Sequence, residues 1–378
     1  DRDLEFGNGA INSHLNVKDN VFELDSASTI HFNRLNFHPY LKLELQPCIK
    51  VTASINKETF PADELFSSLP NGLFVNLDSL QTTGDLDYHF FLQVDEDNID
   101  SLKFESALNK HPNFKIVKFG RTDFREIGKP FMYDARDHGT LVRSFKIGPE
   151  WQNFRPLDSI SIHLQNAVMI SEDGFFYTHK GFYEGAIQYS LIQNIKQKRF
   201  ARGGSTISMQ LVKNLFLNNN KNLMRKVEEI LIVWLIENER LVSKRRMYEI
   251  YLNIIEWGPN HKVYGAEEAA QFYFNKHANQ ITADEAIFLA AIVPSPKKFM
   301  YRFDETHKLR PSMDFYYKLI GGKMVRRGFI TGEAYEALSR EKVEVTGAAV
   351  SWLPKLKVKP EVADSLLEAE GESLLDLE

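Results

Sequence analysis

The spacing of hydrophobic residues changes along the chain, and the first part has a period of two. Up to about residue 145, apolar and polar residues alternate over short runs separated by Asn, Asp, Gly and Pro, which is typical of strands with one buried face. Two stretches between these runs, 62–68 and 99–108, have a helical pattern instead. The alternating runs cover residues 14–17, 41–45, 49–55, 90–94 and 114–119.

Beyond a boundary expected near residue 148, the pattern predicts helices. Residues 159–171 carry apolar side chains at helical spacing. The stretch 225–242 contains an unbroken apolar run from Ile230 to Ile236. This run is too short to cross a membrane, so it predicts a helix that is buried nearly all round.

Capping residues mark where several of these helices begin or end. Ser243 is a candidate N-cap for the helix that follows it. Thr282 and Glu285 have the spacing of a capping box, in which each side chain accepts a backbone N–H of the other residue. Pro294 is expected to end the helix that this box begins. A last helical segment is predicted at 321–340.

These patterns predict an α+β protein in three parts. Residues 1–145 form a β-rich domain whose role the sequence does not reveal, and residues 146–340 form a mainly helical domain. Residues 341–378 form an acidic tail. Beyond Lys359 there are seven acidic residues and no basic one, so we expect the tail to be solvated and flexible.

The charge of the chain is unevenly distributed. The 378 residues have a globular composition, with 43% hydrophobic and 26% charged residues, and the net charge of −5 gives no reason to expect nucleic acid as a partner. Residues 193–226, however, contain eight basic residues and no acidic one. Such a local field favours an anionic ligand or an anionic membrane surface, with a solvated helix face as the alternative. The eight are Lys196, Lys198, Arg199, Arg202, Lys213, Lys221, Arg225 and Lys226.

Cysteine and histidine usage restricts the possible metal sites. Cys48 is the only cysteine, which excludes a disulfide within the chain and a metal site built from several cysteines. No His/Cys cluster in the sequence indicates a tightly held metal. No window approaches about 20 consecutive apolar residues, so no segment of the printed sequence is predicted to span a bilayer.

Two short blocks carry residue types that suit proton transfer and anion binding. Glu172 ends an apolar helical run and has aromatic neighbours, and partly apolar surroundings suit a carboxylate that accepts a proton. By itself, a glutamate at a helix end is more often an ordinary surface residue. Gly203 and Gly204 let the backbone approach an anion closely, and Ser205 and Thr206 add hydroxyl donors or cap the following helix.

The blocks form an ordered series with fixed spacing. Its members are Glu172, Asp173, Phe176, His179, Gly181, 203–207, Lys213, Asn214, Arg225, Lys226 and Glu229, followed by Lys244, 251–253, Gly258, Gly265, 269–270, 273–274, Lys276, 285–286, 289–290 and 294–296. The series resembles the signature blocks of the family 51 glycosyltransferases, which are the peptidoglycan glycosyltransferases that polymerise lipid II. This family includes monofunctional biosynthetic transglycosylases and the transglycosylase domains of class A penicillin-binding proteins. The resemblance covers about residues 150–335.

The resemblance implies catalytic roles for Glu172 and Glu229. Glu172 would be the general base, and Glu229 would help to position a pyrophosphate, with a plain helix salt bridge to Arg225 as the alternative. No tightly bound cofactor is expected, although a Mg²⁺ or Mn²⁺ ion near Glu229 is compatible with the resemblance. The implied substrate-binding residues are Asp173, Phe176, His179, Gly203, Gly204, Ser205, Thr206, Gln210, Lys213, Asn214, Lys221, Arg225 and Lys226.

The resemblance also implies a lysozyme-like fold for residues 146–340 and a particular reaction. A sugar 4-hydroxyl would attack the anomeric carbon of lipid II with inversion, and undecaprenyl pyrophosphate would leave as the glycan strand grows. This is peptidoglycan synthesis in cell wall biogenesis, which determines cell shape. Expected partners are lipid II, the growing strand, the membrane and other cell-wall synthesis or division proteins. The catalytic domain would face the periplasm at a bacterial cytoplasmic membrane, with an anchor helix upstream of residue 1.

Four positions depart from the family pattern. Met209 replaces the first of two glutamines, and Tyr183 and Tyr189 stand where an Asp and an Arg are expected. Lys221 replaces an Arg and lacks its planar, two-pronged geometry. These departures put substrate preference and turnover rate in question. The motif set of a penicillin-binding transpeptidase is not found in these residues, so no such activity is predicted here.

Three alternatives stay open at this stage. A lysozyme-like glycan hydrolase would use Glu172 as a proton donor, although it has no use for the basic block. A catalytically weak scaffold that binds lipid II or glycan is the second alternative, although both glutamates are intact. Apolar residues at 215–217 and 175–176 are candidates for dipping into lipid, with core packing as the other interpretation.

Overall fold

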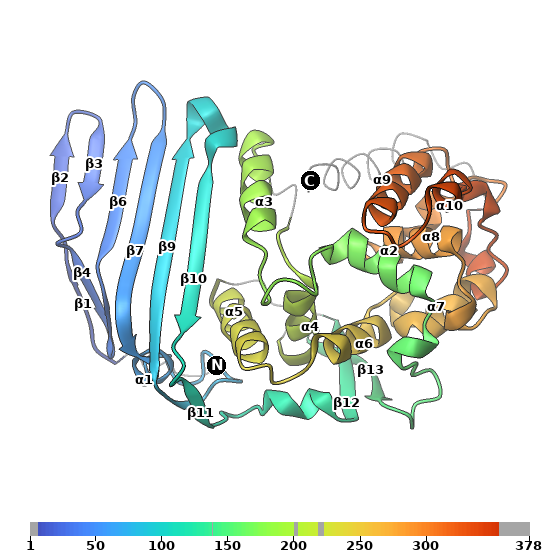
Figure 1. Cartoon of the computed structure of the whole chain (residues 1–378), viewed down its shortest axis with the longest axis horizontal. Coiled ribbons are helices and arrows are strands. Elements are labelled where there is room, and N and C mark those ends of the chain that lie inside the picture. The colour runs from blue at the N-terminus through green and yellow to red at the C-terminus, as the bar shows by residue number, and fades with distance from the viewer. Residues whose placement is uncertain (1–6, 138, 200–202, 218–222, 355–378) are drawn as a thin grey trace. The chain divides into compact units, whose positions relative to one another are not determined.

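The structure is a computed structural model that describes residues 7–137, 139–199, 203–217 and 223–354 (Figure 1). It separates into two compact units. Unit 1 consists of Asp1–Phe124, Tyr183–Ser205 and Lys221–Glu239, and unit 2 consists of Arg125–Phe182, Thr206–Asn220 and Arg240–Glu378. Strands dominate the N-terminal region and helices the C-terminal region, which confirms the predicted α+β class.

Unit 1 is built on antiparallel sheets. Its largest sheet has six strands in the order β10-β9-β7-β6-β3-β2 (Figure 1). These are β2 (Leu15–Lys18), β3 (Val21–Leu24), β6 (Pro39–Glu44), β7 (Lys50–Pro61), β9 (Asp85–Asp95) and β10 (Lys103–Lys110). The smaller sheets contain β1 (Gly9–Asn12), β4 (Thr29–Phe32) and β5 (Leu35–Phe37), and β8 (Gln81–Thr83) with β11 (Lys115–Lys118). All five alternating runs of the sequence therefore contribute to strands.

Three helices complete unit 1: α1 (Ala62–Ser67), α3 (Glu184–Lys196) and α5 (Leu223–Asn238). The Gln188 side chain of α3 donates a hydrogen bond to the Leu102 carbonyl beside β10, at 2.8 Å. The Trp234 indole of α5 donates to the Leu108 carbonyl at 2.6 Å and packs against the rings of Phe66 and Phe114. The predicted buried helix is confirmed, because residues 231–236 of its apolar run are buried, although Ile230 is exposed.

One predicted helix is a strand. The stretch 99–108 was expected to be helical, but the structure has a 3₁₀ helix at Glu96–Ser101 and then β10. Phe104 of β10 lies opposite Leu92 of β9, and the two strands pair over the whole length of β10. The long neighbouring strand supplies a hydrogen-bonding partner and an apolar face, and these outweigh the weak local helical pattern.

Unit 2 contains a hairpin and a set of helices. The hairpin pairs β12 (Phe131–Asp137) with β13 (Thr140–Ile147). The helices are α2 (Ile162–Asp173), α4 (Ile207–Phe216), α6 (Lys244–Ile254), α7 (Gly265–Phe274), α8 (Ala283–Ile292), α9 (Met313–Arg326) and α10 (Gly332–Glu336). Helix α8 is buried all round from its third residue and packs on α2 and α9, so it forms the centre of this unit.

The predicted helix starts in unit 2 are confirmed. The Ser243 hydroxyl accepts the backbone N–H of Arg246. Thr282 and Glu285 form the reciprocal capping box, with hydrogen bonds of 3.3 and 2.9 Å. The last predicted segment begins earlier than expected, at α9. Of the helices that the structure describes, none is long and apolar enough to cross a membrane. The predicted tail falls largely in 355–378, which lies outside the described residues.

Candidate active site

Glu172 lies in the last turn of α2 and is held from two neighbouring helices of unit 2. Its Oε2 atom accepts a hydrogen bond of 2.9 Å from the side-chain amide of Gln210 on α4. The carbonyl oxygen of the same amide accepts a hydrogen bond of 3.1 Å from the hydroxyl of Tyr251 on α6. The Gln210 amide is therefore fixed in orientation, with its N–H group toward the carboxylate. Helix α2 ends one residue later, at Asp173, and Gly174 begins the turn that follows.

Asp173 turns the other way and ties the end of α2 to the start of α4. Its carboxylate accepts the Ile207 backbone N–H at 3.0 Å and the Nε2–H of His179 at 2.9 Å. The Nδ1 atom of His179 accepts the Gly181 backbone N–H at 3.0 Å. An unprotonated Nδ1 and a protonated Nε2 define a neutral tautomer. Asp173 and His179 are both nearly buried, so they support the local structure around Glu172.

Gly181 connects the same network to Thr206. Its φ of 90° lies in the left-handed region, which favours glycine. Its carbonyl accepts the Thr206 hydroxyl at 2.6 Å, and this hydroxyl in turn accepts the N–H of Met209 at 3.3 Å. Thr206 is therefore the N-cap of α4, as one of the two alternatives predicted.

Phe176 is fully buried beneath this turn. Its ring packs against the rings of Tyr177 and Tyr248, and the Lys244 ammonium lies 4.3 Å from its centroid. The sequence left open whether Phe176 dips into lipid or packs in the core, and in the structure it packs in the core. Phe175 is half-buried, and the Arg327 guanidinium lies 4.3 Å from its ring.

Helix α4 presents one polar side along its length. Gln210, Lys213 and Asn214 are three and four residues apart, so they share a face, and all three are half-buried. Met209, one of the departures from the family pattern, is adjacent to this face and is buried in the core. The amide that contacts Glu172 comes from Gln210, so the change at position 209 leaves that contact intact.

A second group of predicted residues lies in unit 1, around the first turn of α5. The Lys226 ammonium forms an ion pair of 2.5 Å with Oε1 of Glu229 and donates 3.3 Å to the Ser205 hydroxyl. Glu229 is only 2% exposed, whereas Ser205 is exposed. Glu229 thus forms a helix ion pair with Lys226, three residues away. The Lys226 ammonium stays partly accessible beside an exposed hydroxyl, which is an arrangement suited to an anion.

The backbone before Ser205 approaches α3 closely. A Cβ atom on Gly204 would lie 3.2 Å from the Cα of Ile187, so a larger residue would push the two segments apart. Gly203 has open space around it. Tyr183 is the N-cap residue of α3, and Tyr189 lies within this helix. Lys221 and Arg202, both predicted in the basic group, lie outside the described residues.

Glu228, the neighbour of Glu229, is also buried. It accepts two hydrogen bonds from Asn76, one from the backbone N–H at 2.9 Å and one from the side-chain amide at 3.0 Å. Burial raises the pKa of this carboxyl, and the Asn76 bonds partly offset that effect. Glu228 therefore joins α5 to the loop around Asn76, which no local sequence pattern indicated.

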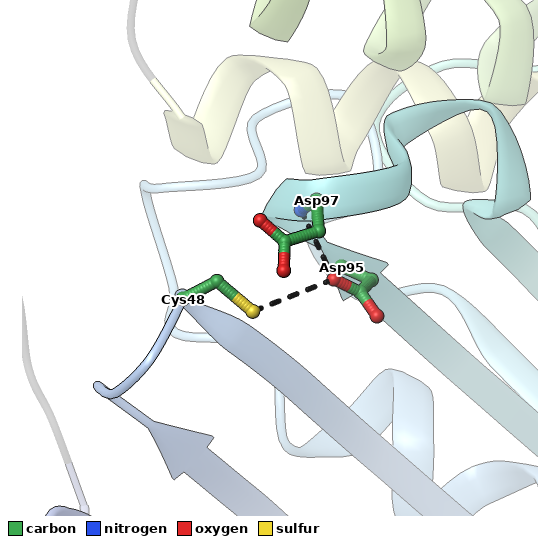
Figure 2. A group of neighbouring side chains, drawn as sticks. All are labelled: Cys48, Asp95 and Asp97. Atoms are coloured by element: carbon green, nitrogen blue, oxygen red, sulfur yellow. Dashed lines mark hydrogen bonds between the residues drawn. The ribbon is translucent and has the colours of Figure 1, made fainter.

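In the described part of the chain, one cluster brings three possible metal ligands together, and it lies in unit 1 (Figure 2). It consists of Cys48, Asp95 and Asp97. Asp95 is already engaged, because it pairs with Lys50 at 2.9 Å and accepts the Asp97 backbone N–H at 3.1 Å. The Cys48 thiol donates a hydrogen bond to Asp95 at 3.8 Å (Figure 2). The nearby Asp97 carboxylate, together with burial, raises the pKa of this thiol, whereas metals bind the thiolate. These contacts fasten the ends of β7 and β9 and give no support for a metal centre.

Two residues of the ordered series that were not among the predicted catalytic or substrate-binding residues contribute to the site. Tyr251 donates to Gln210, and Lys244 lies over Phe176 with its ammonium 3.5 Å from the Ser208 hydroxyl. Their positions in the ordered series were visible in the sequence, but their partners come from distant segments. Burial raises the pKa of Tyr251 well above its ordinary value, so its hydroxyl stays protonated and remains a donor.

Removing the Tyr251 hydroxyl is expected to weaken the hydrogen bond between Gln210 and Glu172. In Tyr251→Phe, the Gln210 carbonyl loses its donor, so the amide can rotate away from the carboxylate. We expect about 1 kcal/mol of lost stability and a several-fold lower turnover. Tyr248→Phe is the matched control, because it removes a buried hydrogen bond to Gln165 without touching Gln210. Thermal melts and turnover of the two variants check this, and equal turnover in both would contradict it.

Comparisons with known proteins identify the family of this chain. A family model described as transglycosylase matches residues 138–315. A biosynthetic peptidoglycan transglycosylase of Nitrosospira multiformis is 43% identical over 169 residues, which cover 45% of this chain and 70% of that protein. The chain belongs to the transglycosylase family.

Further relatives carry the same description. The biosynthetic peptidoglycan transglycosylase of Dechloromonas aromatica is 47% identical over 148 residues, covering 39% of this chain and 62% of the relative. That of Acinetobacter baylyi is 44% identical over 151 residues, covering 40% and 66%. The chain thus spans somewhat less than two thirds of the length of these two relatives.

Proposed function

We propose that this protein is a peptidoglycan glycosyltransferase that polymerises lipid II into glycan strands. Its membership of the transglycosylase family and the names of its relatives support this function. The single observation that carries it is the hydrogen bond from the Gln210 amide to the Glu172 carboxylate. This bond holds the Glu172 carboxylate in a fixed position, as proton transfer to a general base requires.

Glu172 is proposed to take the proton of the attacking hydroxyl. The 4-hydroxyl of one sugar forms a bond to the anomeric carbon of lipid II, while its proton passes to the carboxylate. The bond from that carbon to the pyrophosphate oxygen breaks, so attack and departure on opposite faces invert the anomeric centre. Asp173, His179 and Thr206 hold the turn that positions Glu172. The lysozyme-like fold proposed for residues 146–340 rests on the family resemblance.

Lys226, Ser205 and Arg225 are proposed to receive the departing pyrophosphate, with Lys213 and Lys221 as further cations. Undecaprenyl pyrophosphate gains negative charge on its leaving oxygen, and cations or N–H groups aimed at that charge stabilise it. The proposed location is the outer face of a bacterial cytoplasmic membrane, where lipid II and the growing strand are the partners. Contact with other cell-wall synthesis proteins is part of the same proposal.

Replacing Lys226 is expected to weaken pyrophosphate binding. In Lys226→Ala, about tenfold lower kcat/KM is expected, together with lower stability, because the buried Glu229 carboxylate loses its partner. The double variant Lys226→Ala/Glu229→Gln removes the unpaired charge, so it should recover stability but not activity. Lys226→Arg keeps the charge and serves as the conservative control. Full recovery of kcat/KM in the double variant would contradict a role in substrate binding.

Glu229 is the proposed protein ligand for a divalent cation. Glu229 offers one carboxylate, and Mg²⁺ is commonly held by one or two carboxylates together with substrate phosphates. Such an ion would neutralise pyrophosphate charge. We expect EDTA to lower the rate and Mg²⁺ or Mn²⁺ to restore it. A rate that does not change would exclude the ion from the reaction.

The function is tested by incubating the purified chain with fluorescent lipid II. Longer glycan strands on a gel, which a muramidase then digests, are the expected result. A hydrolase would instead shorten finished strands, and a binding scaffold would change neither substrate. Either of those outcomes would contradict the proposal.

A further inference from the structure

The six-stranded sheet of unit 1 has one side made of apolar residues. Side chains that lie opposite each other in an antiparallel pair share a side, and residues two apart along a strand do so too. Val17 of β2 lies opposite Phe22 of β3, and Phe22 lies opposite Leu43 of β6. Leu43 lies opposite Val51 of β7, and Val51 lies opposite Val94 of β9. These residues therefore share one side of the sheet. This side, the apolar face, consists of Leu15, Val17, Phe22, Leu24, Leu41, Leu43, Val51, Ala53, Ile55, Phe90, Leu92, Val94 and Phe104.

The described residues leave the apolar face partly exposed. None of its thirteen residues is buried, and four on the outer strands are largely exposed: Leu15 at 66%, Val17 at 62%, Phe22 at 44% and Leu41 at 42%. Helices α3 and α5 hydrogen-bond at β10 and the turn before it, at the other end of the strand order from β2 (Figure 1). The opposite side of the sheet carries polar residues such as Asn16, Lys42, Thr52, Gln93 and Glu105.

The size of the face is informative. Six strands about 4.8 Å apart, with about five residues each at roughly 3.4 Å, give an area of about 24 by 17 Å, or roughly 400 Å². That is the size of the largest apolar patch on an ordinary monomer, which is often functional. A second copy stacked face to face would bury roughly 800 Å² in total, below the about 1,200 Å² that stable protein pairs bury. The face is too small to hold a dimer by itself.

The chemistry of the face also disfavours a protein partner. Protein interfaces are roughly 40% polar and are enriched in aromatic residues, Met and Arg. These thirteen residues include three Phe, but the other ten are aliphatic and none is polar. Such a face offers neither a charge nor a side-chain hydrogen bond. Its complement is an uncharged surface that has no hydrogen-bonding groups to satisfy, which describes hydrocarbon chains.

We propose that the apolar face of this sheet binds the hydrocarbon chains of membrane lipids. Polar groups lie at its margins, where lipid headgroups would meet them. Lys57 and Tyr88 are paired at one end of the strands, and Ser106 lies opposite Phe90 at the β10 edge. The choice of a lipid also rests on the proposed function, whose donor substrate is itself a lipid. Unit 1 would then hold chains in an apolar environment next to the bilayer.

The experiment measures lipid uptake rather than glycan synthesis, so its failure can be told apart from failure of the proposed reaction. Pyrene-labelled phosphatidylcholine, whose headgroup has no net charge, is offered in donor vesicles, and loss of excimer emission reports chains that have moved to the protein. The uncharged headgroup separates this uptake from attraction of anionic lipid to the basic block of residues 193–226.

Two variants with equal added charge are compared with the wild type. Val17→Glu/Leu41→Glu places two carboxylates on the exposed part of the face, where folding should tolerate them. Asn16→Glu/Thr52→Glu places two on the polar side of the same sheet. We expect uptake by the wild type and the polar-side variant, and about tenfold less by the face variant, because a carboxylate against hydrocarbon loses its water. Circular dichroism confirms that both variants are folded.

Two results would overturn the proposal. The first is equal uptake by the face variant and the wild type. The second is no uptake by the wild type, together with a dimer in sedimentation equilibrium that the face variant dissociates. That result would assign the face to a second copy of the chain.

Discussion

Glu172→Gln is expected to reduce the rate of lipid II polymerisation by roughly 10²- to 10⁴-fold, which is the usual contribution of a general base. Glutamine has the same shape, and its carbonyl oxygen can still accept the hydrogen bond from Gln210. The variant therefore keeps the local packing and loses only the ability to take a proton. The rate of strand formation from fluorescent lipid II, measured at saturating substrate, gives the effect on kcat.

The control for this experiment is Glu305→Gln, which changes an exposed glutamate of the same unit. It should leave both rate and stability unchanged. Glu172→Gln should also melt within a few degrees of the wild type. A variant that stays folded and polymerises lipid II at the wild-type rate would remove the base from the proposed mechanism. A variant that unfolds would show that Glu172 has a structural role that the contacts do not indicate.

Asp173→Asn is expected to have the largest effect on stability. The carboxylate of Asp173 is buried and accepts hydrogen bonds from Ile207 and from Nε2–H of His179. Asparagine can keep the first bond, but its amide then brings N–H groups against the N–H of His179. Loss of a charge-assisted buried bond costs roughly 2–4 kcal/mol, which for a unit of this size lowers the melting temperature by about 5 to 10 °C.

Asp158→Asn provides the comparison, since Asp158 makes an exposed ion pair with Arg245 and should contribute little. Thermal melts followed by circular dichroism measure both variants. Activity is then measured below the melting range of each. If Asp173→Asn melts like the wild type but has no activity, Asp173 acts on the substrate and not through the turn, and the supporting role assigned to it is wrong.

The elements were predictable wherever one local pattern was strong. All five alternating runs lie in or overlap strands, and the buried helix, the Ser243 cap and the capping box are found as predicted. The stretch 99–108 failed because its pattern was weak and its state depends on β9, which lies opposite it in the sheet. Local propensity decides a segment only when no distant partner competes for its backbone.

The sequence indicated candidate site residues, but it did not indicate the contacts between them. Glu172, Asp173 and His179 were identified because the ordered series resembles the signature blocks of a known family. Their environments differ because Asp173 and His179 face the interior of unit 2, whereas Glu172 contacts the amide of Gln210. Glu228 and Glu229 are neighbours with different partners, Asn76 and Lys226. Whether a carboxylate is free, paired or buried depends on residues far away along the chain.

The sequence by itself determined the family, the α+β class and the order of the chemical groups, because these are recorded in residue types at fixed spacing. The tertiary structure alone decided which side of each element is covered. The alternating strands predicted one apolar side. Only the assembled sheet showed that, among the described residues, this side is partly exposed to solvent. Burial depends on which residues are neighbours in space. The linear pattern shows which side chains are apolar, but it does not show which residues pack against them.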